Sequence, residues 1–143
     1  MSNGMKSGMD RRTLLKRGVG MIAASWVMPR IGLKAASDRI AVASIGIGIM
    51  GNGNLRRMLS NPDLQVVAVC DVDEWRLNDG RDTVETAYAA ATKHGNYKGC
   101  MATKDFREIL ARPDIDAVLI ATGDRWHAVI STMAAKAGKD VYC

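Results

Sequence analysis

The sequence lacks the cysteine pattern of a disulfide scaffold or a zinc centre. Its three cysteines are odd in number and form no Cys-x-x-Cys pair. We therefore predict no disulfide framework and no metal site. Cys70 and Cys100 are expected to be small buried hydrophobic residues instead.

Internal repeats and low-complexity tracts are also missing. The hydrophobic share of 48% and the charged share of 24% are ordinary for a globular protein. These features exclude a repeat protein and a disordered chain. The length of 143 residues then indicates a single domain with a buried core.

An excess of positive charge is missing from most of the chain. The net charge is +5, but residues 1–36 hold seven basic residues against one acidic residue, whereas residues 37–143 hold thirteen against fourteen. The larger part has no electrostatic footprint for a phosphate backbone, so we predict no nucleic-acid partner.

No apolar run is long enough for a transmembrane helix, because the stretch Gly18–Met28 has roughly half of the ~20 residues required. Charges precede this stretch and small residues follow it, as in an export signal. Arg11 and Arg12 resemble the twin-arginine signal for folded proteins. We predict that residues 1–36 bind the twin-arginine export machinery and direct the protein to the periplasm or outside the cell. An amphipathic first helix is the alternative, and removal of the signal stays open.

The segment "RIAVASIGIGIMGNGNLRRMLSNP" predicts a strand, a glycine turn and a helix. The apolar run Ile40–Ile45 has strand length and suits a sheet covered on both faces. Gly46, Gly48 and Gly51 then spell Gly-x-Gly-x-x-Gly. The first glycine permits a tight turn, the second lets the backbone approach a pyrophosphate, and the third lets helix and strand pack closely. A glycine turn that serves packing alone is the alternative.

An acid stands at the distance that a dinucleotide fingerprint requires. The helix that follows the turn would offer N-terminal amides, including those of Ile49 and Met50, to phosphates. A second strand is predicted at Leu64–Cys70, and Asp71 follows it, about 20 residues after the last glycine. This carboxylate can accept both hydroxyls of an adenosine ribose. The alternative is a helix N-cap, for which Asp73 is better placed.

The same acid bears on the choice of cofactor. A carboxylate at Asp71 would repel the additional phosphate of NADP, so NAD is the predicted cofactor. Arg76 is the counter-argument, because a nearby guanidinium can accommodate a 2′-phosphate. A place on a solvated helix face is the alternative for Arg76.

The rest of the chain alternates helices with strands. Glu74 to about His94 predicts a single crossover helix with Trp75 at helical spacing, a weak point at Gly80 and a C-cap at Gly95. The later elements are a strand at Lys98–Met101, a helix with a capping box formed by Asp105 and Glu108, a strand at Asp116–Thr122, a helix at His127–Gly138 and a fifth strand from Val141. This order predicts an α/β fold with a Rossmann-type, doubly wound parallel sheet, and ligands at the carboxyl ends of strands one and four.

The residues "IGIGIMGNG", "VVAVCDVD", "DFREILARPDIDAVLIATGDRWHA" and "AGKDVYC" resemble the Gfo/Idh/MocA oxidoreductases, over about Arg39–Cys143. The resemblance implies a nicotinamide cofactor, a sugar or polyol substrate, a Glu-Lys-Pro motif directly after Cys143 and a second domain beyond it. We therefore expect residues 37–143 to be the dinucleotide-binding domain of a longer enzyme, with the sheet incomplete and the fragment inactive. The full-length protein is expected to be a homo-oligomer.

After strand four the family often has Thr-Pro-Asp-His-x-His, whereas this chain has Gly123 and Arg125 in place of the proline and the first histidine. The resemblance places Thr122 and His127 near the nicotinamide, and His127 is the one catalytic candidate in the chain. A structural hydrogen bond in the first helical turn is the equal alternative for His127. Glycine makes the loop less rigid than proline would.

The predicted function is binding of NAD within an exported oxidoreductase that moves a hydride between NAD(P) and a sugar-like substrate. Three alternatives stay open. A glycosidase of the same family uses NAD for transient oxidation, a methyltransferase binds S-adenosylmethionine through a glycine loop and an acid, and a non-catalytic module only binds the nucleotide.

Overall fold

The structure is a computed structural model that describes residues 39–93 and 97–143. The signal predicted for residues 1–36 and the helix end predicted at His94 and Gly95 lie outside the described residues. Within the described ranges, no helix combines the length and hydrophobicity that a membrane span requires.

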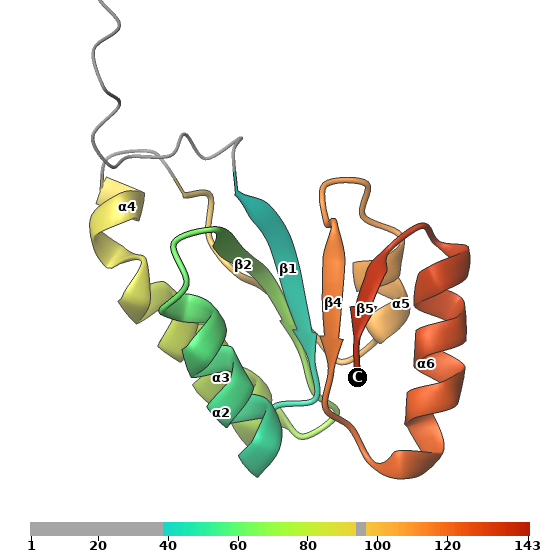
Figure 1. The fold of residues 1–143 in the computed structure, drawn as a ribbon. Coiled ribbons are helices and arrows are strands. Elements are labelled where there is room, and N and C mark those ends of the chain that lie inside the picture. The colour runs from blue at the N-terminus through green and yellow to red at the C-terminus, as the bar shows by residue number, and fades with distance from the viewer. Residues whose placement is uncertain (1–38, 94–96) are drawn as a thin grey trace, which may run out of the picture. The chain divides into compact units, whose positions relative to one another are not determined.

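Parallel strands form a single sheet in the order β3-β2-β1-β4-β5, which confirms the predicted doubly wound α/β fold (Figure 1). The strands are β1 (Ile40–Ile45), β2 (Leu64–Cys70), β3 (Met101–Thr103), β4 (Ala117–Ile120) and β5 (Asp140–Tyr142). The helices are α2 (Ile49–Leu59), α3 (Glu74–Ala87), α4 (Ala89–Lys93), α5 (Phe106–Leu110) and α6 (Asp124–Lys136).

Helices cover both faces of the sheet, α2 and α3 on one side and α5 and α6 on the other (Figure 1). Leu55 and Val84 are fully buried on the first face, and Ile109 and Ile130 are buried on the second. Burial on both faces explains why the central strands are near-continuous apolar runs rather than alternating ones.

Strand β2 contains an additional residue where it pairs with β1. The register shifts by one residue after Val66, so that Val67 has no partner and the next pair includes Ala68. Val67 and Ala68 consequently both pack with the α5 and α6 core, whereas Val66 and Val69 pack with the α2 and α3 core. The bulge therefore determines which side chains meet which helices.

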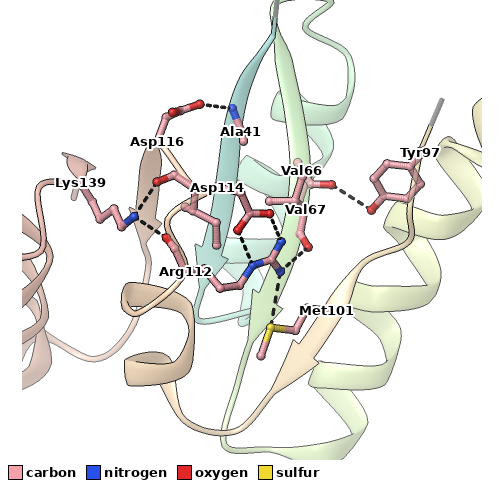
Figure 2. Close-up of polar contacts among 10 residues, drawn as sticks. Ala41, Val66, Val67, Tyr97, Met101, Arg112, Asp114, Asp116 and Lys139 are labelled. Atoms are coloured by element: carbon pink, nitrogen blue, oxygen red, sulfur yellow. Dashed lines mark hydrogen bonds and ion pairs between the residues drawn. The ribbon is translucent and has the colours of Figure 1, made fainter. Parts of the chain in front are cut away.

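Two tyrosines complete the hydrogen bonding of β2 where the short strand β3 does not reach. The pairing of β3 with β2 begins at Ala68. At Val66 the backbone N–H donates to Tyr88 Oη at 3.2 Å. Tyr97 Oη donates to the Val66 carbonyl at 3.0 Å (Figure 2). Burial raises the pKa of Tyr97, so its hydroxyl remains a protonated donor.

A polar network ties together the segments that enter the sheet at the amino ends of β4 and β5 (Figure 2). Lys139 Nζ donates to the carbonyls of Arg112 and Ile115, at 2.5 and 2.8 Å. The guanidinium of Arg112 holds both carboxylate oxygens of Asp114, and this hydrogen bonding lowers the pKa of Asp114. Asp116 accepts the N–H of Ala41 at 2.8 Å.

Several element boundaries differ from those predicted. The single helix predicted from Glu74 is interrupted at Tyr88, where the hydroxyl turns toward β2 and the chain restarts as α4. The third strand occupies Met101–Thr103 rather than Lys98–Met101, because pairing with β2 starts only past the bulge. Strand β4 is shorter than predicted, α6 begins three residues earlier, at Asp124, and β5 begins at Asp140.

One residue-level prediction was wrong, and two residues of α3 have surroundings that the sequence did not indicate. Glu108 does not complete a capping box, because its carboxylate accepts the hydroxyl of Thr103 at 2.8 Å. Gly80, predicted as a weak point of the helix, is also a packing position, since an added Cβ would lie 3.0 Å from Ile47. Trp75 is 74% exposed, and the buried face of α3 is formed by other residues. Cys70 is buried as predicted, whereas Cys100 is only partly buried.

Candidate functional site

The carboxyl ends of the central strands open into a cavity of about 670 Å³. Its walls come from the turns that follow β1, β2 and β4 and from the segment after β3. In a doubly wound sheet this is the edge where the strand order reverses and ligands bind. Among the residues that line the cavity are Gly46, Gly48, Asp71, Arg76, Thr122 and Trp126.

The three glycines of the turn are required for different structural reasons. A Cβ added at Gly46 would lie 2.5 Å from the carbonyl oxygen of Ala121, and a Cβ added at Gly51 would overlap the carbonyl oxygen of Gly46. Gly46 also has a φ of +92°, which other residues rarely adopt. At Gly48 an added Cβ would meet nothing within 4 Å. Gly46 and Gly51 thus serve backbone packing, whereas Gly48 leaves open space in the cavity wall.

The beginning of α2 is suited to an anion. Its N-cap is Gly48, which makes no side-chain capping bond, and its first turn contains no acidic residue. The side chains of Ile49 and Met50 are exposed. The N-terminal amides of this helix therefore have no carboxylate of their own helix as a competitor for a phosphate.

Asp71 is the buried acid of the cavity. It is 8% exposed, and its two carboxylate oxygens accept different backbone amides. Oδ2 accepts the N–H of Ile47 at 2.7 Å, and Oδ1 accepts the N–H of Asp73 at 2.9 Å. Asp73 is the N-cap of α3, as predicted, and accepts the N–H of Arg76. Each oxygen of Asp71 retains a lone pair for a further donor.

Thr122 and His127 are joined by a hydrogen bond at the start of α6. His127 Nε2 lies 2.9 Å from the Thr122 carbonyl oxygen, which accepts only, so Nε2 carries the proton. Nδ1 of the same ring lies 3.0 Å from the sulfur of Cys143. Thr122 Oγ1 is buried and, among the described residues, has no hydrogen-bond partner.

The predicted site residues are only partly brought together. Gly46, Gly48, Asp71 and Thr122 line the cavity, and Ile49 lines a second hollow of about 410 Å³ that shares Gly48. Gly51 is buried against the backbone of Gly46. Met50 is exposed, and His127 is not part of either lining. Sequence reasoning missed two features, the contact of Cys143 with His127 and the position of Trp126 in the cavity wall.

The other titratable groups at the cavity are not arranged for nucleophilic or metal chemistry. Burial raises the pKa of Cys70 to about 12, which keeps its thiol protonated. Asp105 pairs with Arg107, whose backbone amide makes the largest contribution to lowering the pKa of Asp105. Across residues 39–93 and 97–143, no group of three histidine, cysteine or acidic side chains forms a possible metal site.

These features together define a dinucleotide-binding domain. The open wall at Gly48 and the spare lone pairs of Asp71 fit the pyrophosphate and ribose of such a ligand. So does the buried hydroxyl of Thr122, which has no partner within residues 39–93 and 97–143. The chain belongs to the Gfo/Idh/MocA oxidoreductases: the family described as "Oxidoreductase family, NAD-binding Rossmann fold" matches residues 40–143.

Known proteins of this kind are much longer than the chain. A "Glycosyl hydrolase family 109 protein" of Stenotrophomonas maltophilia is 31% identical over 135 residues, which are 94% of this chain and 29% of that protein. A putative myo-inositol dehydrogenase from Sinorhizobium meliloti has a TM-score of 0.54 and 29% identity, covering 73% of this chain and 27% of its own.

GenD2 from gentamicin A biosynthesis, solved in complex with NAD, has a TM-score of 0.56 and 26% identity, with 73% of this chain and 26% of its own covered. A 3-ketoreductase from Actinomadura kijaniata, which shares the fold, was solved with NADP. The comparisons therefore establish a domain for NAD(P) without separating the two cofactors.

Proposed function

We propose that this domain binds NAD in preference to NADP. The observation that carries the proposal is the buried carboxylate of Asp71 in the cavity beside Gly48, because a fixed negative charge there opposes a 2′-phosphate. Arg76 lines the same cavity and is the competing influence. Thr122 adds a hydroxyl donor at the opposite wall.

Calorimetry on the 143-residue chain tests the cofactor preference. We expect NAD to bind more tightly than NADP, and Asp71→Ala to narrow the difference, because the repulsion of the 2′-phosphate is removed. Gly48→Val should abolish binding of both, since its side chain would fill the open wall. Equal affinities of the unmutated chain for NAD and NADP would contradict the proposal.

We propose further that the enzyme containing this domain transfers a hydride between NAD and a hydroxyl carbon of a sugar-like or polyol substrate. NAD supplies the hydride acceptor, and the residues of this chain bind and orient it. Support comes from the oxidoreductase family and from the dehydrogenase neighbour named for myo-inositol. Membership of this family leaves the methyltransferase alternative without support.

The substrate test uses the full-length gene product and the 143-residue chain, both supplied with NAD, against a panel of sugars, polyols and glycosides. We expect NADH from a sugar or polyol with the full-length protein alone. Glycoside cleavage without net NADH would instead favour the function that the Stenotrophomonas relative is named for. Equal turnover by the short chain would show that residues 1–143 contain the whole catalytic machinery.

We also propose export by the twin-arginine route to the periplasm or beyond, on the basis of Arg11 and Arg12. A folded reporter fused after Ser37 should cross the membrane, and replacement of both arginines by lysine should stop it. Undiminished export of the lysine variant would contradict the assignment. Transport in the folded state would let the protein carry a cofactor loaded in the cytoplasm.

A further inference from the structure

We infer that Asp71 is a positioning residue that holds the glycine turn in shape before any cofactor arrives, in addition to serving as a ribose acceptor. The inference rests on the proposed dinucleotide binding at this edge of the sheet. It assigns to the carboxylate a structural partner within the chain itself, the backbone amide of Ile47.

The contact is short and buried. Oδ2 of Asp71 lies 2.7 Å from the nitrogen of Ile47, 24 positions earlier in the chain, and the side chain of Asp71 is 8% exposed. A charged acceptor makes such a bond stronger than one between neutral groups. The other oxygen accepts the amide of Asp73, so a single carboxylate links the turn after β1 to the turn after β2.

Ile47 is the residue on which the shape of the turn depends. It stands between Gly46 and Gly48, whose conformational freedom would otherwise leave the segment loosely defined. Its side chain is 3% exposed and packs against Gly80 of α3, where a Cβ would lie within 3.0 Å of it. The packing holds the side chain and Asp71 holds the amide, so Ile47 is anchored at two points.

The bond also decides which amides remain for a ligand. Because the N–H of Ile47 points to Asp71, the pyrophosphate has to be bound by the amides that follow, at the start of α2. Loss of the carboxylate would release the Ile47 amide and loosen the turn. Affinity should therefore fall even for a ligand that has no hydroxyls to offer to Asp71.

Ligands with and without ribose hydroxyls separate the two roles. Calorimetry compares the binding of ADP with that of 2′,3′-dideoxy-ADP. The proteins are the unmutated chain, Asp71→Ala and the control Asp73→Ala, which removes a nearby carboxylate that accepts the amide of Arg76 in α3. We expect Asp71→Ala to weaken the binding of 2′,3′-dideoxy-ADP by about tenfold, because binding would then have to order the loosened turn. We expect Asp73→Ala to leave its affinity within about twofold. An unchanged affinity of Asp71→Ala for the dideoxy compound would overturn the inference.

A measurement without ligand or variant keeps the inference separate from the proposed function. In nuclear magnetic resonance spectra of the unmutated chain, the Ile47 amide should show slow hydrogen exchange and a scalar coupling across the hydrogen bond to the Asp71 carboxylate carbon. Exchange as fast as that of an exposed loop amide would overturn the positioning role. Failure of the unmutated chain to bind ADP or NAD would instead overturn the proposed function, and the Ile47 measurement would still decide the role of Asp71.

Discussion

Ser44 lies in the middle of β1 with 0% exposure, and within the described part of the chain its hydroxyl has no hydrogen-bond partner. A buried hydroxyl that has lost its water without gaining a partner is destabilising. We expect Ser44→Ala to raise the free energy of unfolding by about 1 kcal/mol, measured by urea denaturation. The matched control is Thr103→Ala, whose buried hydroxyl is bonded to Glu108 and Asp105 and whose loss should lower that free energy. Destabilisation by Ser44→Ala would show that its hydroxyl is satisfied.

The buried thiol of Cys70 makes stability depend on alkaline pH. Burial raises its pKa from 9.0 to about 12. Below pH 9 the thiol is largely neutral in both the folded and the unfolded chain, so its ionisation takes nothing from the free energy of unfolding. Between pH 9 and about 12 the thiol ionises in the unfolded chain first, and the free energy of unfolding falls. Cys100, with a pKa also raised to about 12, adds to the same decline, so Cys70→Ala should reduce it but not abolish it.

Iodoacetamide labelling of the native chain provides an independent check of the thiols. Exposed Cys143 should react readily, and Cys70 should react only on unfolding. Mass spectrometry of the labelled peptides distinguishes the two positions. Rapid labelling of Cys70 in the folded chain would contradict its burial.

The edge of β2 depends on tyrosine hydroxyls rather than on a neighbouring strand. Tyr97→Phe would leave the buried carbonyl of Val66 without its donor, and Tyr88→Phe would leave the amide without its acceptor. We expect each change to lower the free energy of unfolding by about 1–2 kcal/mol. Tyr142→Phe is the control, because Tyr142 is 70% exposed and its hydroxyl should contribute little. If the free energy of unfolding of all three variants equals that of the unmutated chain, water replaces the tyrosine hydroxyls.

Lys139 joins the corner before β5 to the segment before β4 (Figure 2). These contacts lie at the amino ends of the strands, whereas the glycine turn follows the carboxyl end of β1. We expect Lys139→Met to lower the free energy of unfolding by about 1.5–3 kcal/mol, because two carbonyls lose a charged donor. NAD affinity should be unchanged, since the network lies away from the cavity. Lys136→Met, on the exposed last turn of α6, is the control and should alter neither quantity. A loss of NAD affinity in Lys139→Met, together with the loss of stability, would show that the amino and carboxyl ends of the sheet are coupled.

The sequence by itself determined the order of the strands and of the helices that join them, the glycine turn and the place of Asp71, but not the break between α3 and α4. These depend on local causes, namely apolar runs of strand length, a backbone φ that suits glycine at Gly46, and the short separation between a strand end and the next turn. Parallel strands joined by helices then place those strand ends at one edge, so the main features of the cavity could be predicted.

Only the tertiary structure decided the contacts that join distant segments. The bulge at Val67, the tyrosine hydroxyls on β2 and the packing of Gly80 on Ile47 each depend on a neighbour far along the chain. The same holds for the hydrogen bond from the Ile47 amide to Asp71. The local spacing indicates that an acid stands near the turn, but it does not indicate this bond. Such contacts depend on how closely two backbones approach in three dimensions. The pattern of residue types along one segment does not determine that distance.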